Sequence, residues 1–171
     1  MSDVLDWHHA VADIPDEGIE ITREATADER QRIAESLDLL ACASLIVRYG
    51  IKPRGGGHYR LAGTLAARVE QSCVVTLEPL TNDITESFSV DFWPENALPA
   101  QAGGLIDVHD EPDMEPITDD QIDAGRIIFE CFANGIDLFP RKPGAAFEAP
   151  EPAPEKTEGP FAALARMRQK R

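Results

Sequence analysis

The chain has 171 residues with a net charge of −15, and 43% of its residues are hydrophobic while only 6% are aromatic. That length holds one ordinary domain with short extensions, whose core must be filled mostly by aliphatic side chains. No stretch approaches the roughly 20 apolar residues that span a bilayer, and the acidic start carries no secretory signal. Three widely spaced cysteines argue against a disulfide framework, so we expect a cytoplasmic protein without membrane contact.

The charge is unevenly distributed along the chain. The last eleven residues contribute +4, which leaves −19 for residues 1–160. A body this acidic repels nucleic acid and anionic membranes over a Debye length of about 8–10 Å, and it attracts basic partners. The same acidity also keeps a protein soluble, so charge alone does not establish a basic partner.

The N-terminal part predicts two short strands followed by a helix. Hydrophobic residues alternate within residues 4–24, and residues 14–18 contain the Pro and Gly typical of a turn. Thr26 and Glu29 have the spacing of a capping box, in which Thr caps the helix and Glu returns a hydrogen bond. The helix is expected to end at about Leu37.

The middle of the chain predicts three long antiparallel strands. The first covers residues 41–51, and the glycine-rich residues 52–57 form a hairpin loop. A second hairpin is expected to turn at residues 80–83, where Asn and Asp suit a tight turn. Its arms place these residues on one face: Leu65, Ala67, Val69, Cys73, Val75, Leu77, Ile84, Phe88, Val90 and Phe92. In the first strand the shared face is Ala43, Leu45, Val47, Tyr49 and Ile51.

An acidic stretch precedes the second helix. Residues 107–123 contain eight acids and no Lys or Arg, yet their spacing does not match a calcium-binding loop. We therefore favour an acidic loop over a cation site, after a brief strand at residues 105–108. Thr118 begins a second capping-box pattern, and the helix that follows should end before Pro140. Its apolar stripe is expected to contain Ile122, Gly125, Ile128, Phe129, Phe132, Ile136 and Phe139.

These elements predict an α+β fold in which two helices cover an antiparallel β-meander sheet. The domain is expected to occupy residues 1–147. Residues 148–171 predict a disordered Pro/Glu-rich linker and a short basic amphipathic tail helix. The tail either docks on a partner or only adds solubility, and the pattern favours neither.

No stretch carries a catalytic or metal-binding signature such as CxxC, HExxH or GxSxG. Cys73 is predicted to be a buried structural thiol, since none of the four histidines stands in a context that would make it a base for this thiol. We therefore expect no enzyme activity, no metal, no cofactor and no small-molecule substrate.

Several segments together, in order, resemble the YceD family of bacterial large ribosomal RNA subunit accumulation proteins. The segments are residues 63–69, 71–79, 88–92, 137–144 and 159–164. The positions that carry the motif within them are Cys73, Leu77, Pro79, Pro140 and Pro143. The resemblance covers most of the chain from about residue 5.

The chain departs from the family at one place. Many members carry a Cys-x-x-Cys pair at the hairpin and further cysteines after the last helix, which suits zinc. Here Cys73 occupies the first place, Thr76 the second, and residues 140–143 read Pro-Arg-Lys-Pro. We expect no zinc site, and we expect hydrophobic packing in its place.

The resemblance implies a role in the accumulation of large-subunit ribosomal RNA. Our first hypothesis is a non-enzymatic factor that binds a basic ribosomal protein or a large-subunit precursor particle. The alternative is an RNA-binding factor that contacts ribosomal RNA phosphates. The basic residues proposed for either contact are Arg68, Arg141, Lys142, Arg166, Arg168, Lys170 and Arg171.

Overall fold

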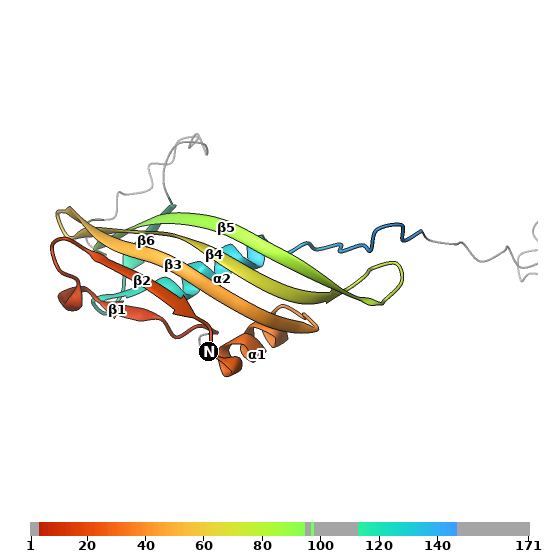
Figure 1. Ribbon diagram of the computed structural model, residues 1–171. Coiled ribbons are helices and arrows are strands. Elements are labelled where there is room, and N and C mark those ends of the chain that lie inside the picture. The colour runs from red at the N-terminus through yellow and green to blue at the C-terminus, as the bar shows by residue number, and fades with distance from the viewer. Residues whose placement is uncertain (1–3, 95–96, 98–112, 147–171) are drawn as a thin grey trace, which may run out of the picture.

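The computed structural model describes residues 4–94, 97 and 113–146. Five strands form the main sheet in the order β2-β3-β4-β5-β6, and β1 pairs with β7 as a separate ribbon. Both helices lie on the same side of the main sheet (Figure 1). The strands are β1 (His8–Ala10), β2 (Ile19–Glu24), β3 (Ala41–Gly55), β4 (His58–Ser72), β5 (Pro79–Pro94), β6 (Asp113–Ile117) and β7 (Gln121–Asp123). The helices are α1 (Ala27–Ser36) and α2 (Ala124–Asn134), with a short 3-10 turn at Val11–Asp13.

The predicted α+β class is confirmed, and β3 to β5 form the expected antiparallel meander, which β2 extends as an antiparallel neighbour of β3. The fifth strand was not predicted as a member of the sheet. β6 pairs in parallel with the last residues of β5, from Val90↔Asp113 to Pro94↔Ile117. Among the described residues, β5 therefore has a neighbour on both sides only at this end.

One face of the sheet is buried and the other is largely exposed. Every second residue of β3, from Leu45 to Ile51, is buried beneath the helices. Ala43 was predicted on this face but is exposed. A register shift between Cys42 and Ser44 breaks the alternation, so the Cys42 side chain takes the inward place.

The capping box that opens α1 is present as predicted. The Thr26 hydroxyl accepts from the Glu29 N–H, and the Glu29 carboxylate accepts from the Thr26 N–H at 2.7 Å. Glu29 also accepts a 2.7 Å hydrogen bond from the indole N–H of the fully buried Trp7. One carboxylate therefore joins α1 to the segment that precedes β1.

The predicted turn of the second hairpin is misplaced. Residues 80–83 belong to β5, and the chain reverses at residues 73–78 instead. The Cys73 N–H donates to the Glu78 carbonyl at 2.9 Å, and Leu77 has a φ of +59°. The alternation of Cys73, Val75 and Leu77 imitated a strand, although these residues form the turn.

Two predictions near the helices are also wrong. The first strand is shorter than expected, because Leu5 and Trp7 enter the core and only His8–Ala10 pairs, with β7. Thr118 does not cap α2. Residues 119 and 120 have positive φ in a tight turn, β7 follows, and the Asp123 side chain caps the helix by accepting from the Arg126 N–H.

The buried part of the α2 stripe is largely as predicted, with Ile122, Gly125, Ile128 and Phe132 buried. Phe139 was placed on that stripe but is 70% exposed, because α2 ends at Asn134 and the chain then leaves the core. The predicted strand at 105–108, the linker and the tail lie outside the described residues. Within the described ranges, no helix is long and apolar enough to cross a membrane.

Candidate functional site

The hairpin turn and the chain beyond α2 meet at one end of the main sheet. The Val74 N–H donates to the Pro140 carbonyl at 2.9 Å, and the Lys142 N–H lies 3.4 Å from the Cys73 sulfur. We call residues 72–79 together with 137–143 the Cys73 junction. Its two halves are about 65 residues apart in the chain, and they contain the five motif positions of the family resemblance: Cys73, Leu77, Pro79, Pro140 and Pro143.

The sulfur of Cys73 is the hydrogen-bond acceptor on which this junction is centred. It has no exposed surface and accepts from the N–H groups of Thr76, at 3.5 Å, and Lys142. The Thr76 hydroxyl and these backbone donors lower the pKa of the thiol to about 6. The prediction of a buried thiol is confirmed. Its hydrogen-bond partners among the described residues include donors on Thr76 and Lys142.

These contacts correct the expectation of hydrophobic packing in place of a zinc site. Residues 73, 76 and 142 do lie together. Hydrogen bonds to one sulfur connect them, while Leu77, Leu138 and Phe139 are each at least 70% exposed. In the described part of the chain, no three His, Cys, Asp or Glu side chains lie where they could hold a metal ion.

Further polar contacts fix the junction to the sheet. The Gln71 amide donates to the Asp137 carbonyl at 2.8 Å, and its oxygen accepts from the Asn82 amide at 2.7 Å. The Ser72 hydroxyl donates to the Leu77 carbonyl at 3.1 Å. Side chains on β4 and β5 therefore hold both the turn and the segment after α2.

Most basic candidates in the described residues are already paired. Arg68 makes a bidentate contact with Asp83 at 2.7 and 3.0 Å, and Lys142 binds Glu78 at 2.9 Å. The Arg68 hydrogen bonds lower the pKa of Asp83, and the Lys142 hydrogen bond lowers that of Glu78. Arg141 is exposed and has no ion pair among the described residues. The tail candidates Arg166, Arg168, Lys170 and Arg171 lie outside those residues.

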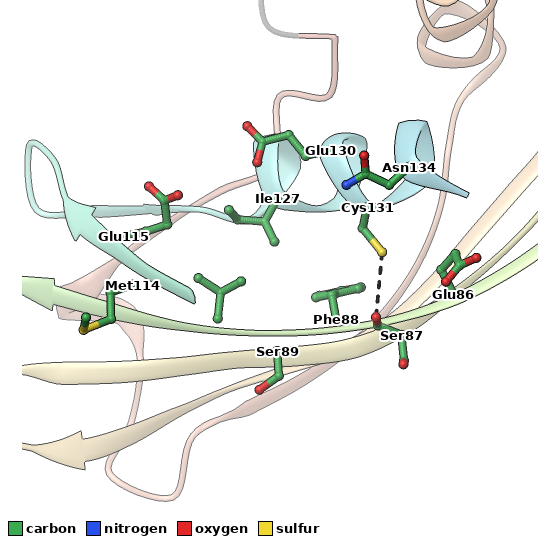
Figure 2. Close-up of a pocket in the computed structure, with 11 residues that line it drawn as sticks. Glu86, Ser87, Phe88, Ser89, Met114, Glu115, Ile127, Glu130, Cys131 and Asn134 are labelled. Atoms are coloured by element: carbon green, nitrogen blue, oxygen red, sulfur yellow. Dashed lines mark hydrogen bonds between the residues drawn. The ribbon is translucent and has the colours of Figure 1, made fainter. Parts of the chain in front are cut away.

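A second feature is a groove of about 550 Å³ between α2 and the strands β5 and β6, which the sequence did not predict. Phe88, Val90, Met114 and Ile127 supply its apolar lining, and Figure 2 shows Ile127 and Cys131 directed from α2 into the groove. The carboxylates at its borders are Glu86, Glu115 and Glu130. The groove therefore has a few apolar side chains between acidic borders, and Ser87, Ser89 and Asn134 add polar groups to its lining.

The sequence carried only indirect signals of this groove. Glu115 belongs to the acidic stretch that was predicted as a loop, but it lies on β6, where it binds Arg126 at 2.7 Å. Glu130 and Glu86 come from α2 and β5, and the fold alone brings them to the same opening.

No protein-family model, curated protein or solved structure matches the chain.

Proposed function

We propose that this chain is a non-enzymatic factor that supports the accumulation of large-subunit ribosomal RNA. It would act by binding a basic ribosomal protein or a large-subunit precursor particle. The observation that carries the proposal is the Cys73 junction, because three of the five motif positions, Cys73, Leu77 and Pro140, take part in its hydrogen bonds and the other two lie within the same two segments. A motif that builds one local structure is a more specific resemblance than five separate matches.

The charge distribution favours a basic protein as the direct partner. Residues 1–160 carry −19, so their field opposes RNA and attracts cationic chains. Two of the three proposed RNA-binding cations in the described part, Arg68 and Lys142, are neutralised by carboxylates. A phosphate would have to displace those carboxylates before it could bind.

The exposed apolar side chains at the junction suit a protein partner as well. Leu77 and Val74 lie in the turn, Leu138 and Phe139 lie in the segment after α2 that is bonded to it, and all four are at least 45% exposed. Apolar groups of this size at one end of a domain are typical of surfaces that contact another protein. RNA contact through Arg141 and the basic tail is the alternative.

Affinity purification from cells tests the proposal. The tagged full-length protein is recovered at low salt, and the bound material is identified by mass spectrometry and RNA sequencing, with and without nuclease. We expect large-subunit proteins or precursor particles, and we expect the direct protein contact to survive nuclease. Recovery without any ribosomal material would refute the proposed function.

The same experiment separates protein contact from RNA contact. Arg141→Glu should leave recovery within about twofold of the wild type if a basic protein is the ligand. The matched control is Arg54→Glu, which makes the same charge change near the end of β3. Loss of recovery with Arg141→Glu alone, together with sensitivity to nuclease and salt, would establish the RNA-binding alternative.

A further inference from the structure

The edge of β5 is only partly covered by another strand. β6 pairs with β5 at residues 90–94, whereas residues 80–89 have β4 on one side and no strand on the other among the described residues. An uncovered edge presents N–H and C=O groups that can pair with an extended chain. The groove opens along this edge, from Glu86 to Val90.

The backbone at this edge faces the groove. The Cys131 thiol donates a weak hydrogen bond to the Ser87 carbonyl, with 3.9 Å between sulfur and oxygen. Figure 2 shows this contact crossing from α2 to β5. Because backbone polar groups alternate between the two sides of a strand, Ser89 presents its N–H and C=O to the same side as Ser87.

The two ends of the groove limit the chain that it can accept. At one end Gly135 lies against the side chains of Ile84 and Glu86, where an added Cβ would come within 2.8 Å of both. At the other end β6 begins beside Val90. Three residues of β5, 87–89, remain between these limits, which corresponds to about 10 Å of extended chain.

The borders of the groove determine the charge of its occupant. Glu115 and Glu130 share one cation, Arg126, at 2.7 and 3.0 Å, and Glu86 has no ion pair among the described residues. The groove is therefore net negative. These carboxylates repel RNA and a second copy of this chain, whose net charge is −15.

We infer that this groove binds an extended basic segment of a protein partner, which adds as a strand to the edge of β5 in line with β6. Apolar side chains of the segment would contact Phe88, Met114 and Ile127, and its Lys or Arg side chains would bind the carboxylates of Glu86, Glu115 and Glu130. This inference rests on the proposed function for the identity of the partner. The recognition itself is testable with purified protein.

The probe is a fluorescent peptide in which Lys and Val alternate, and the readout is fluorescence anisotropy with the full-length protein. We expect saturable binding and, in hydrogen exchange, protection of the backbone amides of Ser87 and Ser89, which face the groove. A peptide with the same charges but with alternate backbone nitrogens methylated should bind at least about tenfold more weakly, since it lacks the N–H donors of an added strand. Equal binding of the two peptides would overturn strand addition.

A charge reversal tests the location. Glu86→Lys should weaken binding of the peptide by about tenfold, because the attraction between Glu86 and the Lys side chains of the peptide becomes a repulsion. The matched control is Glu24→Lys on β2, which makes the same change at the opposite edge of the sheet. Equal effects of the two substitutions would show only a general response to net charge and would overturn the site.

Two further results separate this inference from its alternatives. Replacing Arg166, Arg168, Lys170 and Arg171 by Gln should leave the affinity within about twofold, whereas a marked gain would mean that the chain's own tail occupies the groove. In the purification from cells, ribosomal material that is bound equally by wild type and Glu86→Lys would refute the groove and leave the proposed function standing. Peptide binding in vitro without recovery of ribosomal material from cells would support the groove and refute the proposed function.

Discussion

Substitution of Glu29 by Ala should destabilise the domain far more than a surface change in α1. Glu29 is only 6% exposed, and its carboxylate accepts from the Trp7 indole and the Thr26 backbone, both at 2.7 Å. The guanidinium of Arg23 lies 4.6 Å from the Trp7 ring centroid and 3.9 Å from the same carboxylate. The substitution therefore removes the acceptor of a fully buried donor and half of a helix cap.

The expected loss can be worked out from these contacts. Leaving the Trp7 N–H without a partner costs about 2–3 kcal/mol, because the hydrogen bond to a charged acceptor is lost and water cannot reach the donor. Loss of the contact to Thr26 costs about 1 kcal/mol more, as for other helix caps. The total is about 3–4 kcal/mol, a large part of the 5–15 kcal/mol typical of a domain.

Urea unfolding followed by circular dichroism and tryptophan fluorescence measures this loss. The control is Glu35→Ala in the same helix, where the carboxylate accepts from exposed Gln31 and the expected loss is within about 0.5 kcal/mol. Glu29→Gln keeps one acceptor oxygen for Trp7 and should lose about 1–2 kcal/mol. If Glu29→Ala and Glu35→Ala differ by less than about 1 kcal/mol, the role assigned to this carboxylate is wrong.

Three other predictions follow from buried groups. Burial alone would raise the pKa of Glu29, but hydrogen bonds from Thr26 and Trp7 outweigh it and lower that pKa in the folded state. The ionised Glu29 therefore stabilises the fold fully above its unfolded pKa of about 4.3, and this contribution is lost as pH falls through the lower folded pKa. Glu29→Gln should therefore flatten the acid limb of stability against pH, and an unchanged limb would contradict this. Iodoacetamide at neutral pH should modify Cys131 before Cys73, because Cys73 is fully buried even though its pKa is lowered. Peptide mass spectrometry measures the labelling, and rapid labelling of Cys73 in the native protein would show that the Cys73 junction is open. Gly125→Ala should cost at least about 2 kcal/mol in urea unfolding, since its Cβ would overlap the Leu5 carbonyl, and a stabilised variant would mean that this contact relaxes freely.

Local patterns in the sequence were sufficient to predict the structure where it depends on residues that are near neighbours in the chain. The capping box of Thr26 and Glu29 spans three residues, and the alternation of β3 records its buried face directly. The register shift near Cys42 could not be predicted, because the alternation of residues in the sequence shows no sign of it. The turn at residues 73–78 was misassigned because its apolar residues continue the strand pattern of β4.

Contacts between distant segments were beyond the sequence patterns. The Trp7 indole reaches Glu29 across 22 residues, and Lys142 reaches the Cys73 sulfur across 69. Each is one polar atom meeting another, which produces no periodicity in either segment. The groove is a stronger example, because its lining comes from β5, β6 and α2, and only their packing makes an opening.

The pairing of β1 with β7 has a consequence for the order of folding during synthesis. β2 to β5 are joined by hairpins and a short helix, so residues 19–94 contain every pairing partner of β2, β3 and β4, and β5 lacks only its short pairing with β6. The segment with Leu5 and Trp7 is synthesised before these strands, yet the Trp7 carbonyl accepts from the N–H of Gly125, which is synthesised after them. Because Gly125 is synthesised after residues 19–94, the N-terminal segment completes its packing only after α2 has been made.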